Sequence, residues 1–81
     1  MRKTHGSISD RSALHQRLVK AEERISSMQH QIAQQRKLVA ELERTGRSAS
    51  HAKYLLAGLE LLQAARLDSR DRILNQLKAQ T

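Results

Sequence analysis

The stretch ELERTGRSASHAKYLL, Glu41 to Leu56, decides how this chain folds. It places one glycine, Gly46, and several small polar residues between two long segments that carry charges and leucines. Gly46 can adopt the left-handed backbone that ends a helix, because it has no side chain to clash. Ser48 or Ser50 can then cap a second helix. Because links this short join antiparallel neighbours, we predict that the chain turns back at residues 45–48.

The segment before the turn has the heptad spacing of a coiled coil. From Leu14 to Leu42, alternating steps of four and three residues meet an apolar side chain at every position except Gln35. A repeat that averages 3.5 residues keeps one strip of the helix facing a partner helix. We therefore predict a helix over residues 8–44, preceded by a flexible basic arm over residues 1–7. Its seam, the strip that faces the second helix, is Leu14, Leu18, Ala21, Ile25, Met28, Ile32, Gln35, Val39 and Leu42.

Gln35 is the one polar residue of this first seam. A polar residue can simply be tolerated at a loosely packed position. Alternatively, a buried amide can fix the register or the orientation of paired helices. The sequence leaves both interpretations open.

The segment after the turn, residues 49–79, is predicted to form a second helix with a broader apolar face. Gln63, Arg66 and Arg70 interrupt this face. The predicted second half of the intrachain seam is Leu55, Leu56, Leu59, Leu62, Leu67, Ile73, Leu74 and Leu77.

A further apolar strip near the turn points away from this predicted seam. It contains Tyr54 and Leu61, with the small residues Ala57, Gly58 and Ala65 beside them. Exposed apolar patches mark interfaces, so Tyr54, Leu61, Ala57 and Ala65 are the predicted oligomer interface. The expected assembly is a homodimer in which two antiparallel hairpins form a four-helix bundle.

The composition supports an all-α, coiled-coil-like hairpin that forms a single domain over residues 8–80. The chain has 81 residues, no proline and one aromatic residue, Tyr54, which favours helix over sheet. It has no cysteine, which suits a reducing compartment. The basic start MRKTHGSISD is followed by no apolar stretch, and the apolar run YLLAGL is too short to cross a membrane. We therefore expect a cytoplasmic protein with no membrane partner.

The charge is strongly basic, with a formal net charge of +7. Part of the excess lies near the amino terminus, where the candidate polyanion contacts are Arg2, Lys3, Arg11, Arg17 and Lys20. Cations attract nucleic acid, but a single-strand reader normally displays several aromatic side chains for base stacking. Nucleic-acid binding is therefore the alternative function rather than the first one.

No pattern of reactive side chains points to catalysis. The four histidines, His5, His15, His30 and His51, have no metal-site spacing. Asp68 and Asp71 lie among arginines, which predicts surface ion pairs. We expect no enzyme activity, no metal and no cofactor.

The run QIAQQRKLVAELERTG, a short polar link, the spaced pattern A..LL..LE.LQA and then RDRIL resemble a group of small helical-hairpin proteins of unknown function from soil-dwelling alpha-proteobacteria. The resemblance covers roughly residues 28–77 and implies a bacterial cytosolic hairpin. It implies no catalytic or binding residue. The matching positions are Ile32, Ala33, Arg36, Val39, Leu42, Glu43, Gly46, Ala52, Leu55, Leu56, Leu59, Glu60, Arg70, Asp71, Arg72 and Leu74.

The function that these patterns favour is a small interaction or scaffolding module that works through helix-on-helix packing. Its expected partner is a second copy of itself, and another protein remains an open alternative. A nucleic-acid-binding or regulatory accessory protein is the rival function. An inhibitor or antitoxin-like protein also stays open, because such a protein needs only a complementary surface.

Overall fold

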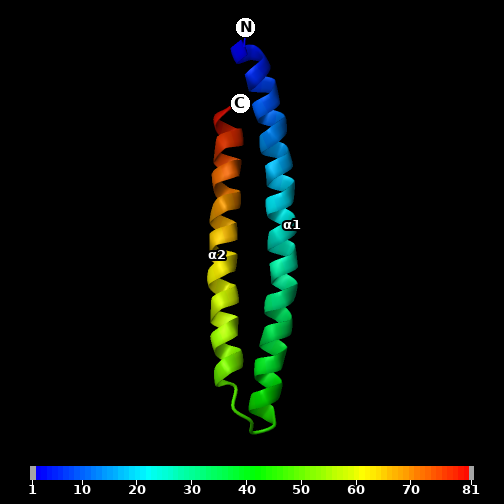
Figure 1. The fold of residues 1–81 in the computed structure, drawn as a ribbon, viewed down its shortest axis with the longest axis vertical. Helices are drawn as coiled ribbons and strands as arrows, with labels where there is room; N and C mark the ends of the chain where they lie inside the picture. The colour runs from blue at the N-terminus through cyan, green and yellow to red at the C-terminus, as the bar shows by residue number, and fades with distance from the viewer. Residues whose placement is uncertain (1, 81) are drawn as a thin grey trace.

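The chain folds as an all-α, antiparallel two-helix hairpin. The computed structural model describes the backbone of residues 2–80 and the side chains of residues 11–80, in which helix α1 spans Arg2–Arg44 and helix α2 spans Ser50–Ala79. The two helices lie side by side along most of their length, and α1 extends beyond the end of α2 (Figure 1). The molecule measures 67 × 16 × 14 Å. The predicted fold class is therefore confirmed.

The turn at Gly46 is the hydrogen-bonded glycine motif that commonly ends helices. Gly46 has a φ of 75°, in the left-handed region. Its N–H donates to the carbonyl oxygen of Glu43 at 3.2 Å, and the N–H of Arg47 donates to the carbonyl oxygen of Leu42 at 2.8 Å. These bonds satisfy carbonyl groups that the end of α1 would otherwise leave unpaired. The predicted role of Gly46 is confirmed.

The predicted cap of the second helix is wrong. The residue at the N-cap position of α2 is Ala49, which makes no side-chain cap bond. The oxygen of Ser48 accepts only a long 3.5 Å bond from the Ser50 N–H. Ala49 is buried and packs with Val39 and Ala52, so this position serves the apolar core rather than the cap. The turn consequently runs one residue further than predicted, through residue 49.

The start of α1 also differs from the predicted boundary. The helix begins at Arg2, so the backbone of residues 2–7, predicted as a flexible arm, continues the helix. The predicted polyanion contacts Arg2 and Lys3 lie outside the residues whose side chains are described.

The buried residues of α2 follow a regular heptad spacing, whereas the sequence predicted a broader apolar face. Alternating steps of three and four residues from Ala49 to Leu77 meet only buried or half-buried residues. These are Ala49, Ala52, Leu56, Leu59, Gln63, Arg66, Arg70, Ile73 and Leu77. Side-chain burial also confirms the α1 seam, because each of its nine predicted members is buried or half-buried.

Leu55 and Leu62 are the corrections to the predicted seam, because each remains 45% exposed. They directly precede the seam residues Leu56 and Gln63, so they flank the contact between the helices instead of filling it. Leu67 and Leu74 also flank it, but both are half-buried.

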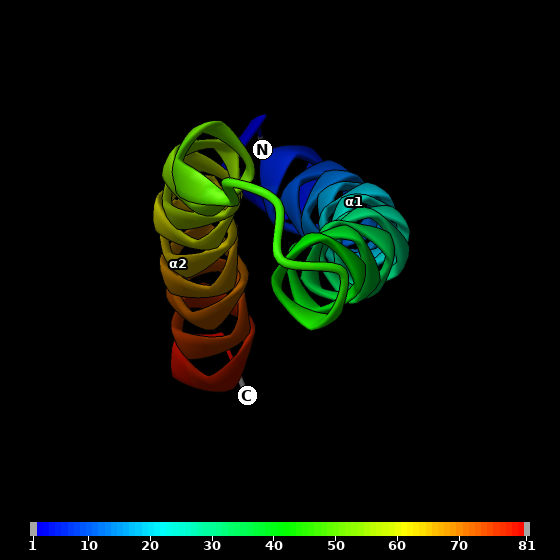
Figure 2. The same cartoon turned by 90° about the horizontal axis from the view of Figure 1, so that it is seen from below.

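The core is a thin line with an apolar cluster at each end. At the turn, Val39 packs with Ala49 and Ala52. At the open end, Leu14 packs with Ile73 and Leu77. Seen along the long axis, the helices are inclined to one another and only one side of each faces the other (Figure 2). Most of the surface of each helix is therefore left for other contacts.

Candidate interaction surfaces

Two glutamines cross the middle of the seam in opposite directions. Gln35 of α1 donates its side-chain N–H to the carbonyl oxygen of Ala52 at 3.0 Å. Gln63 of α2 donates to the carbonyl oxygen of Ile25 at 3.1 Å. Both bonds require one alignment of the helices, which supports the interpretation of Gln35 as a register-fixing residue. Within the described residues, the Oε1 atom of Gln63 and the Nε atom of Arg66 are buried without a hydrogen-bond partner.

Ion pairs between the helices define one long side of the hairpin. Arg36 pairs with Glu60 at 2.9 Å, and Lys53 pairs with Glu43 at 2.6 Å. With Leu18 and Ile25 of α1 and Ala49 and Leu56 of α2 labelled a, all four paired residues occupy e positions of the heptads. We call this side the e side. Its exposed pairs add little stability, but they show which flanks of the two helices lie together.

The opposite side, which we call the g side, carries the g and c positions of both helices. Hollows along it join Arg17 and Arg24 of α1 with Ser69 and Gln76 of α2, all at g positions. Both helices therefore line this side at the open end, and the chemistry there differs from the chemistry near the turn.

Near the turn, the α2 part of the g side is apolar, and this apolar surface extends onto the neighbouring f positions, Tyr54 and Leu61. On α2 a hollow of about 450 Å³ is lined by Tyr54, Leu55, Ala57, Gly58, Leu59, Leu61 and Leu62. Tyr54 is 76% exposed and Leu61 is 75% exposed. Leu38, at a g position of α1, is 46% exposed. We call the exposed set, Leu38, Tyr54, Leu55, Ala57, Gly58, Leu61, Leu62 and Ala65, the turn-end apolar surface.

This surface contains every residue of the predicted oligomer interface, namely Tyr54, Ala57, Leu61 and Ala65, and all four are exposed. Sequence reasoning missed Leu38, Leu55 and Leu62 as members. Their g positions in the heptads are the signal that could have found them. Because the sequence analysis assigned Leu55 and Leu62 to the seam, it did not use their g positions.

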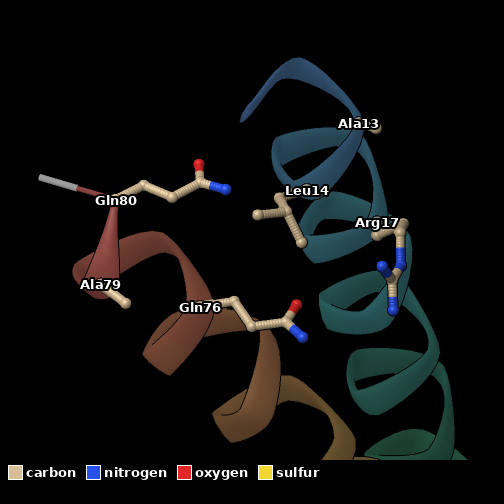
Figure 3. Close-up of a pocket in the computed structure, with 6 residues that line it drawn as sticks. All are labelled: Ala13, Leu14, Arg17, Gln76, Ala79 and Gln80. Carbon is tan, nitrogen blue, oxygen red and sulfur yellow. The ribbon is translucent and has the colours of Figure 1, made fainter. Parts of the chain in front are cut away.

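The half of the g side at the open end is basic and polar. One hollow, of about 240 Å³, is lined by Arg17, Lys20, Ala21, Arg24, Ser69 and Ile73. The next hollow, of about 420 Å³, lies between Arg17 and the residues Gln76 and Gln80. Figure 3 shows Leu14 pointing from α1 toward α2, and Gln76 and Gln80 extending from α2 toward α1. Of the predicted polyanion contacts, Arg17 and Lys20 lie here, whereas Arg11 lies outside both linings.

The described residues contain no assembled catalytic or metal site. No group of three or more potential metal ligands occurs among them, and His15, His30 and His51 are exposed. Asp68 pairs with Arg72 at 2.7 Å and Asp71 pairs with Arg70 at 3.0 Å, as predicted. Neither described helix contains a stretch long and apolar enough to cross a lipid bilayer.

No family model, curated protein or solved structure matches this chain.

Proposed function

We propose that this chain is a non-enzymatic interaction module of the coiled-coil type, which pairs with a second copy of itself through the turn-end apolar surface. The observation that carries the proposal is the exposure of large apolar side chains on a hairpin whose seam is already filled. Tyr54, Leu61, Leu55 and Leu62 are between 45% and 76% exposed. They are neighbours on α2, so their exposure forms a patch rather than a scatter of single residues.

A second copy fits this surface because the surface carries no charged side chain that would require an oppositely charged partner. Between residues 54 and 65 of α2, the g, c and f positions are Leu55, Leu62, Gly58, Ala65, Tyr54 and Leu61. An uncharged patch is best covered by another apolar patch, and a two-fold dimer presents the same patch from both partners. Gly58 supports close approach, since the space where its Cβ would lie has no neighbouring atom within 4 Å.

The coiled-coil part of the proposal is supported by the heptad spacing of buried residues on both helices. Helix-on-helix packing is then the means of recognition both within the chain and between chains. Two hairpins joined in this way place four helices together over the length of the turn-end apolar surface.

The substitution Leu61→Asp tests the proposal. A carboxylate at this position would be buried without a partner in the dimer, which costs several kcal/mol. We expect self-association to weaken by at least about 100-fold. By sedimentation equilibrium the wild type should have twice the chain mass of 9.2 kDa, and the variant should have the mass of one chain.

Val19→Asp is the matched control, because Val19 is also a large exposed apolar residue, at 54%, but lies outside the turn-end apolar surface. It should keep the wild-type mass. A wild type that sediments as a single chain at high micromolar concentration would contradict the proposal, as would equal masses for wild type and Leu61→Asp.

A further inference from the structure

The open end of the g side forms a cationic groove that self-association does not explain. Arg17, Lys20 and Arg24 of α1 line a hollow that Ser69 of α2 completes. The three cations lie on successive turns of one helix, and the rise of 1.5 Å per residue spreads them over about 10 Å. The groove is therefore a short linear array of positive charge.

These cations have no carboxylate partner among the side chains that the structure describes. Arg36, Arg44, Lys53, Arg70 and Arg72 are paired with carboxylates, whereas none of these ion pairs uses Arg17, Lys20 or Arg24. Glu22 and Glu23 lie between Lys20 and Arg24 in sequence, but they occupy the e and f positions, away from the g side. On α2, Asp68 and Asp71 are paired with arginines of their own helix. The positive charge of the groove is therefore available to a ligand.

The polar groups beside the cations are suited to phosphate oxygens. Ser69 provides a hydroxyl within the groove, and the amides of Gln76 and Gln80 line the adjoining hollow with Arg17 (Figure 3). The described lining of both hollows contains no carboxylate. Phosphate contacts in nucleic-acid complexes use these side-chain types, arginine and lysine with serine and glutamine.

We propose that the groove of Arg17, Lys20, Arg24 and Ser69 binds the phosphate backbone of duplex nucleic acid. A duplex carries one negative charge for about every 1.7 Å of its axis, so it can engage all three cations at once. No aromatic side chain lines the groove, so bases are not stacked and binding is independent of sequence. The site adds Arg24 and Ser69 to the contacts predicted from sequence, and it does not depend on self-association through the turn-end apolar surface.

A lipid surface is the less suitable partner for this groove. Protein segments that bind anionic lipids typically carry clusters of about four to eight basic residues. The groove supplies three, and its apolar lining is confined to Ala21 and Ile73. An apolar residue that could insert into a bilayer is therefore missing from its described rim.

The test is fluorescence anisotropy with a labelled 20-base-pair duplex of arbitrary sequence. Three phosphate contacts predict a slope of about −2.7 for the logarithm of affinity against the logarithm of salt concentration. A rise from 50 to 200 mM NaCl should therefore weaken binding by about 40-fold. The triple variant Arg17→Gln/Lys20→Gln/Arg24→Gln should lose at least about tenfold in affinity at 50 mM NaCl and most of the salt dependence.

The control, Lys37→Gln/Arg44→Gln/Arg47→Gln, removes the same number of charges near the turn. It should lose less than about threefold in affinity. The groove residues are exposed, so both variants should keep the wild-type helical circular dichroism spectrum. Equal losses in the two variants would overturn the proposal, because they would show attraction by net charge alone.

Two other outcomes would overturn it as well. One is the absence of binding to the duplex at 50 mM NaCl. The other is tighter binding to phosphatidylserine vesicles than to the duplex at equal anionic charge, which would assign the groove to a membrane surface. Self-association is measured separately by sedimentation, so either proposal can fail without the other.

Discussion

At the residue scale, the fold depends on the left-handed backbone of Gly46. Its φ of 75° is costly for residues that have a Cβ, while the space around that Cβ is empty. We therefore expect Gly46→Ala to destabilise the hairpin by about 1 kcal/mol through conformation alone, which lowers the melting temperature by about 4–8 °C. Gly46→Asn should lose less, because asparagine tolerates this conformation better. Thermal denaturation followed by circular dichroism measures both, and an unchanged midpoint for Gly46→Ala would contradict the assigned role.

Single residues also show what local sequence rules can predict. The role of Gly46 was predictable because the chain reverses direction at the end of α1, and such a turn requires a residue that adopts positive φ easily. The cap at Ala49 was not, because two rules compete at that position. Serines on both sides favour a polar cap, yet the packing of Ala49 with Val39 places an alanine there instead. Tertiary packing decided the outcome, and a local pattern does not contain that information.

At the scale of elements, the two seams differ in how plainly the sequence displays them. The α1 seam is nearly all apolar, so its spacing was readable directly. The α2 seam contains Gln63, Arg66 and Arg70, and leucines flank it, so the largest apolar residues do not mark its centre. Leu55 and Leu62 were therefore placed in the seam, although they belong to the turn-end apolar surface. The spacing of three and four residues predicts burial better here than hydrophobicity does.

The crossed glutamines make a prediction for the paired helices. Gln35→Leu/Gln63→Leu removes two interhelical hydrogen bonds but also removes a buried oxygen without a partner. We expect stability to rise by about 1 kcal/mol while the single alignment is lost, because polar seam residues specify register at a cost in stability. Thermal denaturation should show a higher midpoint, and sedimentation velocity should show several species.

The control for this prediction is Gln16→Leu/Gln29→Leu, which adds the same side chains at exposed positions of α1 away from the g side. It should keep one sedimenting species if seam polarity, rather than added surface hydrophobicity, sets the alignment. If Gln35→Leu/Gln63→Leu is less stable than the wild type and still sediments as one species, the glutamines stabilise the hairpin but do not set the alignment of its helices.

At the scale of the whole molecule, the two halves of the g side determine how two copies can meet. A parallel dimer would bring the groove residues Arg17, Lys20 and Arg24 of both copies together, which like-charge repulsion opposes. A fully overlapped antiparallel dimer would cover each apolar half with a basic half. Of these three arrangements of the proposed dimer, only a staggered antiparallel one, with the two-fold axis near Gly58, would pair apolar with apolar and would leave both grooves free. The open ends then point in opposite directions.

The most direct test of the proposed staggered antiparallel dimer is the distance between spin labels on its two copies. The chain has no cysteine, so Arg47→Cys in the exposed turn provides one labelling site per copy. Position 47 lies about 16 Å along the axis from Gly58, so pulsed electron paramagnetic resonance should give a label separation of about 35 Å. A separation below about 20 Å would contradict the staggered antiparallel arrangement, and the absence of any dipolar coupling would contradict self-association itself.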